Sequence, residues 1–246
     1  MRALFLVLLF FCGSAIAANQ GNVWFSIEGG GATPITSSAT TTIPMSGSSL
    51  PDDYVSTSTT SYLAGVGSGY QFLFPRFTTH NVSWLSADRI GLLFDDYLTT
   101  KINGQVLKYQ LFPAANYNYN ISSQVVWVDN QLDFVRWHDA ASFFDTGIGG
   151  AFDTTSNYQQ TSLNTTRNVL PNPAFANNSE INFAYRFGIG LNYNWQHFTV
   201  AALYDYVNLG TAKTGNSTAS SNPTALPGLS FPLQFNEWLI SLRYNL

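Results

Sequence analysis

Few side chains in this chain are spaced for catalysis. The three histidines, His80, His138 and His197, fall in separate predicted turns, away from any serine and acid with which they could share a proton. Neighbouring carboxylates such as Asp95 and Asp96 point to opposite faces of a strand, so they cannot act as a pair. No His, Cys and carboxylate spacing indicates a metal site, and no glycine-rich loop indicates phosphate binding. The sequence therefore predicts no catalytic residue, no metal and no cofactor.

A different set of charged residues lies on predicted strands, on the face opposite the large apolar side chains. A charge enclosed by a narrow barrel is costly unless it is paired, so we expect acids and arginines to meet in a network across an enclosed interior. Two interpretations stay open: the network fills the interior, or it lines a narrow pore and selects ions. The eight candidates are Glu28, Arg89, Asp95, Asp145, Arg186, Asp205, Glu237 and Arg243.

The clearest alternation of side chains runs from Ile181 to Tyr206 and predicts two long strands joined by a tight turn at Gln196 and His197. The odd positions up to Trp195 are apolar or aromatic, and the even positions are small or polar. Aliphatic residues in the middle with aromatic residues near the ends are typical of a strand that crosses lipid. A soluble sandwich or lipocalin-like barrel is the alternative. Residues expected to face lipid or to form aromatic girdles are Phe187, Ile189, Leu191, Tyr193, Trp195, Tyr204, Trp238 and Tyr244.

The remaining pattern predicts an all-β, eight-stranded antiparallel up-and-down transmembrane barrel, with ten strands as the alternative. On the fourth strand we expect the odd residues from Tyr117 to Trp127 to face outward, with a β-bulge after Trp127. Long loops are expected near residues 33–59, 101–116, 153–179 and 209–230, alternating with short turns. This rhythm places both termini on the periplasmic side.

The start of the chain predicts export. A basic residue, Arg2, precedes a short apolar run and the small-x-small site Ala15-Ile16-Ala17, which is typical of a signal peptide over residues 1–17. Residues 18–246 then form the barrel domain, which contains no cysteine and no apolar run long enough for a membrane helix. Only 10% of the residues are charged and the net charge is -4, which argues against a nucleic-acid partner.

The glycine-rich strands 62–70 and 144–152, the segment Tyr204-Asp205-Tyr206 and the last strand, Trp238 to Leu246, resemble small outer-membrane β-barrel proteins of the OmpA/OmpX type, in a Gram-negative surface-antigen subgroup. The resemblance implies an outer-membrane location and contact with outer-membrane lipid. It also implies assembly through the C-terminal strand by the barrel-assembly machinery, and a host or surface ligand for the extracellular loops. The implied role is structural or surface interaction, in adhesion or envelope integrity. A narrow porin-like channel is the alternative, and a rim-located outer-membrane hydrolase or acyltransferase comes third.

Overall fold

The computed structural model describes residues 21–35, 38–43, 51–74, 77–79, 82–163, 174–217 and 226–246 of the 246-residue chain. The expected signal peptide, residues 1–17, lies outside them. No helix in these ranges is long and apolar enough to cross a membrane. The strands found there are β1 (Gly21–Pro34), β2 (Ser38–Ile43), β3 (Asp52–Thr57), β4 (Ser61–Leu73), β5 (Phe77–Thr79), β6 (Val82–Lys108), β7 (Phe112–Trp137), β8 (Ala140–Ser162), β9 (Asn178–Trp195), β10 (Phe198–Lys213) and β11 (Ser230–Asn245).

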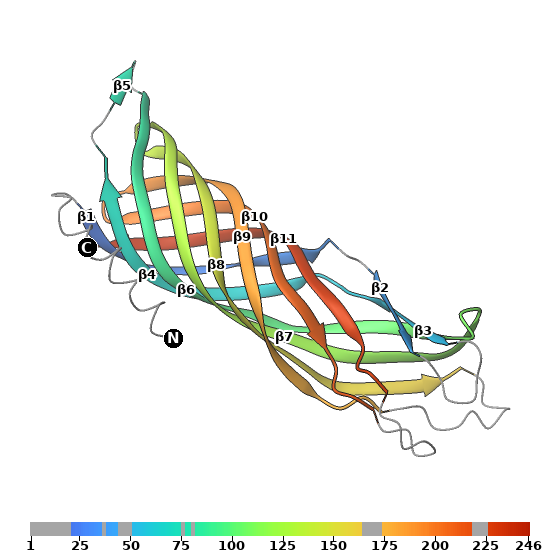
Figure 1. Ribbon diagram of the computed structural model, residues 1–246. Helices are drawn as coiled ribbons and strands as arrows, with labels where there is room; N and C mark the ends of the chain where they lie inside the picture. Colours follow the sequence, from blue (N-terminus) through green and yellow to red (C-terminus); the bar gives the residue numbers. More distant parts are fainter. Residues whose placement is uncertain are drawn as a thin grey trace.

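Eight of these strands close a ring. Each of β1, β4, β6, β7, β8, β9, β10 and β11 pairs antiparallel with the next, and β11 returns to β1. Figure 1 shows the blue first strand beside the red last strand, where the ring closes. The eight-stranded prediction is confirmed and the ten-strand alternative is wrong, because β2, β3 and β5 pair outside the ring.

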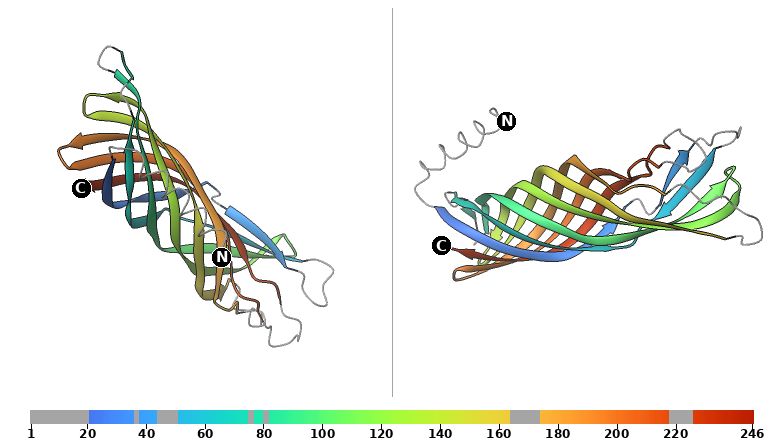
Figure 2. Two further views of the ribbon diagram at one scale, coloured as in Figure 1. Left: turned by 60° about the vertical axis from the view of Figure 1, so that its left-hand side comes forward. Right: turned by 90° about the horizontal axis from the view of Figure 1, so that it is seen from below.

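Three ring strands are much longer than the roughly 9–11 residues that a tilted strand needs to cross a bilayer. Strand β6 has 27 residues, β7 has 26 and β8 has 23. Their far ends continue past the ring, where β3 pairs with β6 and β2 pairs with β3 (Figures 1 and 2). We call this five-stranded sheet of β2, β3 and the far parts of β6, β7 and β8 the extension.

The extension corrects the expected loops. The loop near 101–116 is mostly strand, since β6 runs to Lys108 and β7 begins at Phe112. Residues 38–43, 52–57, 153–162 and 209–213 also lie in strands. Asn103-Gly104, a dipeptide typical of hairpin turns, lies within β6 instead. Asn103 pairs with Asn118, and the missing side chain of Gly104 leaves space for the ring of Tyr117. Buried Ile102 and Val106 hold this part of β6 to the ladder.

The facing predicted for the fourth strand is wrong. In β7 the odd residues from Tyr117 to Trp127 point into the barrel, and Trp127 is 0% exposed. The alternation continues unbroken to Asp133, and the irregularity lies between Asp133 and Val135 rather than after Trp127. Large aromatic side chains fit inside because the neighbouring strand is small at this level: Trp127 pairs with Gly149.

The outer face of the ring is apolar. The eight residues expected to face lipid or to form girdles all point outward, with exposed fractions from 37% for Tyr204 to 67% for Trp238. A soluble barrel would bury these side chains, whereas here Arg89, Arg186 and Arg243 are buried and the aromatic and aliphatic residues are exposed. The soluble alternative is therefore inconsistent with the structure.

Adding one methyl group to β4 tests how tightly the ring closes. A Cβ at Gly69 would collide with the carbonyl of Ile90, the Cα of Gly91 and the ring of Trp24, whereas a Cβ at Gly150 meets nothing within 4 Å. We expect Gly69→Ala to lower the free energy of unfolding by about 1–3 kcal/mol. The matched control Gly150→Ala should be neutral or stabilising by up to about 1 kcal/mol. Urea unfolding in lipid vesicles measures both, and equal midpoints would contradict the packing described.

Candidate functional site

Arg186 on β9 is the centre of the buried charges. Its Nη2 donates to Asp129 Oδ1 at 2.7 Å and its Nε lies 3.2 Å from Asp145 Oδ2. Its Nη1 lies 3.4 Å from Asp95 Oδ2 and 3.9 Å from Glu28 Oε1. These four acids come from β1, β6, β7 and β8, so one guanidinium links five strands. We call these five residues the Arg186 cluster.

Trp127 connects the Arg186 cluster to the packed interior. Its indole Nε1 donates to Asp95 Oδ2 at 2.8 Å, and the Arg186 guanidinium lies 5.3 Å from the centre of its ring. A cation beside an aromatic ring is attracted by the ring's electron-rich face. Because β7 faces the opposite way to the prediction, Trp127 contributes to the charge network as well as to the packing of the interior.

Arg89 makes a second, separate pair. Its two terminal nitrogens bond both oxygens of Asp133 at 2.6 and 3.0 Å, and its Nε donates to Gln71 Oε1 at 3.4 Å. Asn192 donates to the same aspartate at 2.9 Å. A buried bidentate arginine and carboxylate pair with further hydrogen bonds offsets much of its desolvation cost.

Arg243 makes a third group, again apart from the Arg186 cluster. Its Nη2 donates to Gln131 Oε1 at 2.5 Å, and its guanidinium lies 4.9 Å from the centre of the Trp24 ring. The predicted charges are thus all buried, but Arg89 and Arg243 each have partners that the sequence did not indicate. Asp129, Gln131 and Asp133 were not predicted, because the wrong face assigned up to Trp127 and the bulge expected after it broke up the inward series to which all three belong. These three residues continue the alternation at odd-numbered positions that includes Trp127, and that alternation could have identified them.

Two of the predicted acids lie beside each other without a basic partner. Asp205 on β10 and Glu237 on β11 are paired in register, and all four carboxylate oxygens are buried without a hydrogen bond to the described residues. Within the ring, these two join the five acids that contact Arg186 and Arg89. Asp153 on β8 is also buried and accepts hydrogen bonds from Ser123 and Asn182. Eight buried carboxylates therefore share the interior with three arginines, an excess of five acids.

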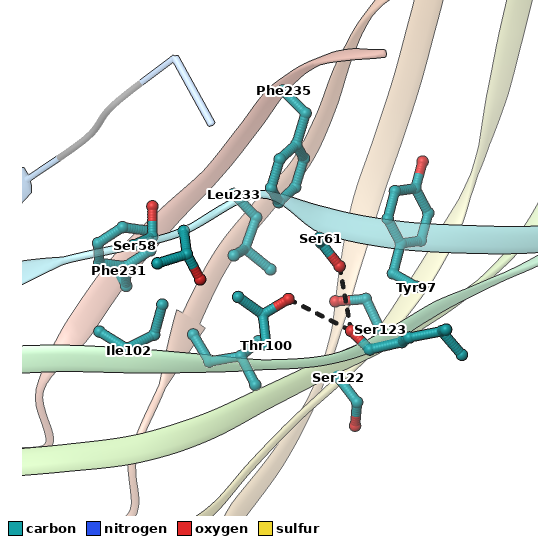
Figure 3. A pocket seen from close by; sticks show the side chains of 13 residues that line it. Ser58, Ser61, Tyr97, Thr100, Ile102, Ser122, Ser123, Phe231, Leu233 and Phe235 are labelled. Carbon is teal, nitrogen blue, oxygen red and sulfur yellow. Dashed lines mark hydrogen bonds between the residues drawn. The ribbon is translucent and has the colours of Figure 1, made fainter. Parts of the chain in front are cut away.

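An apolar layer covers the charged interior at the end of the ring next to the extension. Tyr97 stacks on Phe235 with ring centres 5.9 Å apart, and Ile102, Ile121 and Leu233 pack beside them (Figure 3). The hydroxyls of Ser61 and Thr100 both donate to the Leu98 carbonyl at 3.0 and 3.3 Å. The cavity between these side chains measures about 20 Å³, which holds about one water molecule. At this level the interior is filled by side chains.

Beyond that layer an aromatic cluster fills the inner face of the extension. Tyr54 lies 5.6 Å from both Tyr117 and Phe175, and Tyr158 lies 5.8 Å from Tyr117 and 5.0 Å from Phe175, between ring centres. Tyr119 stacks on Tyr117 at 6.2 Å. Burial raises the pKa of Tyr117 to about 12 and also raises the pKa values of Tyr54, Tyr119 and Tyr158. The extension therefore has a hydrophobic core of its own.

The histidines are not assembled into a site. His138 and His197 lie in two turns at the end of the ring opposite the extension, where His138 packs edge-on against Trp137 and His197 Nδ1 lies 3.3 Å from the Asn245 carbonyl. His80 lies outside the described residues. Within the described ranges, no group of three or more His, Cys, Asp and Glu side chains is placed to hold a metal ion.

Removing the Arg186 guanidinium should destabilise the barrel strongly. We expect Arg186→Met to lower the free energy of unfolding by about 3–5 kcal/mol, because four acids lose their shared cation in a buried site. Adding Asp129→Leu should recover part of that loss, since the nearest unpaired carboxylate is then gone. The control Lys101→Met changes an exposed charge on β6 and should have little effect. Urea unfolding in vesicles distinguishes these variants, and an Arg186→Met protein as stable as the control would contradict the network.

The buried tyrosines should resist ionisation. With folded pKa values above the ordinary 10.0, the neutral phenols stabilise the extension fully below about pH 10. That contribution is lost as pH rises from about 10 through about 12, because the unfolded chain ionises first. Ultraviolet absorbance of tyrosinate should show a late group of phenols, and Tyr117→Phe should remove one of them. Titration of every tyrosine near pH 10 would contradict the buried cluster.

Comparison with solved structures identifies the architecture. The structure is similar to the crystal structure of the outer-membrane protein OprG from Pseudomonas aeruginosa, with a TM-score of 0.51 and 9% identity over 92% of this chain and 96% of that chain. Neisserial surface protein A matches with a TM-score of 0.40 and 9% identity over 93% and 100% of the two chains. Ail, the attachment invasion locus protein of Yersinia pestis, solved with the heparin analogue sucrose octasulfate, matches with a TM-score of 0.34 and 12% identity over 92% and 99%.

No protein-family model and no curated protein matches the sequence. The fold assignment depends on the closed ring and on the OprG superposition, which shows shared architecture at an identity too low to transfer a function. The chain therefore has the fold of the small eight-stranded outer-membrane β-barrel proteins, in agreement with its resemblance to the OmpA/OmpX type.

Proposed function

We propose that this chain is an integral outer-membrane β-barrel whose filled ring is a structural anchor and whose extension makes surface contacts, in adhesion or envelope integrity. The observation that carries the proposal is the combination of an interior closed by packed side chains at the end next to the extension with strands that continue far beyond the ring. A pore needs an open interior, whereas a support for a contact surface needs rigidity. The paired arginines and the apolar layer supply that rigidity.

The outer face supports the membrane placement. Exposed aliphatic residues such as Ile189 and Ile240 lie at mid-strand, and Tyr193, Trp195 and Tyr244 lie near the strand ends away from the extension. Lipid accepts this band because every ring strand has both edges paired and no backbone group is left open to hydrocarbon. We place the extension outside the cell and the short turns at His138 and His197 in the periplasm, with export by a cleaved signal peptide.

The last strand supports assembly through the C-terminus. Trp238 to Leu246 pairs with β1 on one side and, over most of its length, with β10 on the other, so the ring cannot close until this segment is seated. We propose that the barrel-assembly machinery recognises this segment before it pairs with β1.

Shortening the long hairpin tests the surface role. Thr100 pairs with Ile121, so residues 101–120 can be replaced by Asn-Gly while the ring keeps its ladder. We expect this variant to fold, shown by different gel migration before and after boiling, but to lose at least about 90% of the adhesion to cultured cells that the full chain gives a non-adherent Gram-negative strain. Undiminished adhesion together with unchanged detergent sensitivity of the cells would contradict the proposal.

One observation favours a narrow cation channel as the second candidate. The interior holds an excess of five acids, and the carboxylates of Asp145, Asp205 and Glu237 have oxygens without a hydrogen-bond partner among the described residues. Such a lumen would attract cations if the apolar layer opened. Planar-bilayer recording of the refolded protein separates the two functions, because steady cation-selective conductance contradicts a filled anchor. The geometry of the histidines gives no support to a rim enzyme.

A further inference from the structure

The tip of the β6–β7 hairpin has an unusual backbone. The Leu111 N–H donates to the Lys108 carbonyl at 3.2 Å and closes a turn in which Tyr109 and Gln110 have φ values of 55° and 62°. Both central residues are thus left-handed, as in the type I′ hairpin turn that favours Asn-Gly. A residue with a Cβ adopts this conformation at a cost, so a tyrosine and a glutamine stand where smaller residues would be more stable.

A buried acid holds this turn in place. The carboxylate of Asp52 on β3 accepts a hydrogen bond from the Tyr109 N–H at 3.0 Å, and the Lys108 ammonium lies 5.4 Å from the centre of the Tyr109 ring. The strained turn is therefore supported from the neighbouring strand. Strain of this kind, retained by surrounding contacts, is commonly associated with a functional position.

Large apolar side chains are exposed at the same tip. Leu111 is 71% exposed and Phe112 is 65% exposed, and Tyr109 beside them is also exposed. Lys108 beside the tip is exposed and Asp52 is buried, while Asp53, which pairs with Leu107, is half-buried and accepts a hydrogen bond from Thr42. Tyr109 lies eleven residues beyond Leu98, the last strongly exposed apolar residue of β6 near the ring, which corresponds to about 36 Å of strand. Figure 1 shows this hairpin end far from the C-terminus of the ring.

We propose that Tyr109, Leu111 and Phe112 form an insertion tip that enters the headgroup layer of a phospholipid bilayer facing the cell. Leucine and phenylalanine favour the acyl boundary, tyrosine favours the interface, and Lys108 reaches lipid phosphates. Three large side chains are far fewer than the roughly 20–30 residues a side of a specific protein interface. Each insertion is weak, but many barrels in one membrane that insert at the same time would attach the two membranes firmly. The inference deepens the proposed surface-interaction function by naming its partner as lipid.

Vesicle capture tests the insertion tip. Protein held in lipid nanodiscs is mixed with vesicles of phosphatidylcholine, with or without phosphatidylserine, and the protein that floats with the vesicles is measured. We expect the wild type to be captured, and the double variant Leu111→Ser and Phe112→Ser to be captured at least about tenfold less, given the transfer free energies of these side chains. Phosphatidylserine should increase capture, and Lys108→Gln should remove that increase. Ile35→Ser is the matched control, since Ile35 is an exposed apolar residue at the same end of the barrel but outside the tip.

A second variant separates binding from folding. Tyr109→Asn with Gln110→Gly relieves the left-handed strain, so it should raise the resistance of the folded protein to boiling while it lowers vesicle capture. Capture of the Leu111 and Phe112 variant equal to the wild type would overturn the insertion tip, and so would a wild type that no vesicle captures. If cells still adhere through the long hairpin while vesicles are not captured, the partner is a protein. The surface function then stands, and only the lipid inference fails.

Discussion

The closed ring of hydrogen-bonded strands is the constraint on which the rest of the structure depends. An eight-stranded ring leaves an interior wide enough for side chains and little more, so each inward position is matched to its neighbours across the barrel. The inward glycines show this matching. The side chain of Asp205 occupies the space beside Gly188, and that of Asp95 occupies the space beside Gly65. Trp127 packs against Gly149. Large and small residues therefore alternate around the interior because no other arrangement fits.

Burial of charge follows from the same constraint. The outer face must be apolar if lipid surrounds the ring, so the polar residues of each strand are directed into a space that bulk water does not fill. Arg186 offsets part of that cost by bridging acids from four other strands, and Arg89 does so by a bidentate pair with Asp133. Asp205 and Glu237 have no arginine partner among the described residues, so their desolvation cost is not offset in this way.

The extension is held in a fixed position far from the ring, because its strands continue those of the rigid ring. Because β6, β7 and β8 pass from the ring into the extension without a break, the position of the Tyr109 turn is fixed by strands that are anchored in the barrel. The aromatic cluster around Tyr117 gives the extension a core where it no longer has a closed ring to support it. A surface contact made there would lose little conformational entropy on binding, since its backbone is already ordered.

The period-two alternation by itself predicted eight ring strands, with ten left open, and determined the outward face of β4, β8, β9, β10 and β11, because apolar and small or polar residues are clearly separated there. It also identified eight of the buried charges, but not Asp129, Asp133 or Asp153. It could not assign the face of β7, where Tyr119 and Trp127 face inward while Val126 and Val128 face outward, because apolar residues occupy both faces. The length of the extension, the partners of Arg89 and Arg243, and the left-handed turn at Tyr109 were decided only by the tertiary structure. These features depend on which distant strands lie side by side and in which register, and local side-chain periodicity carries no information about either.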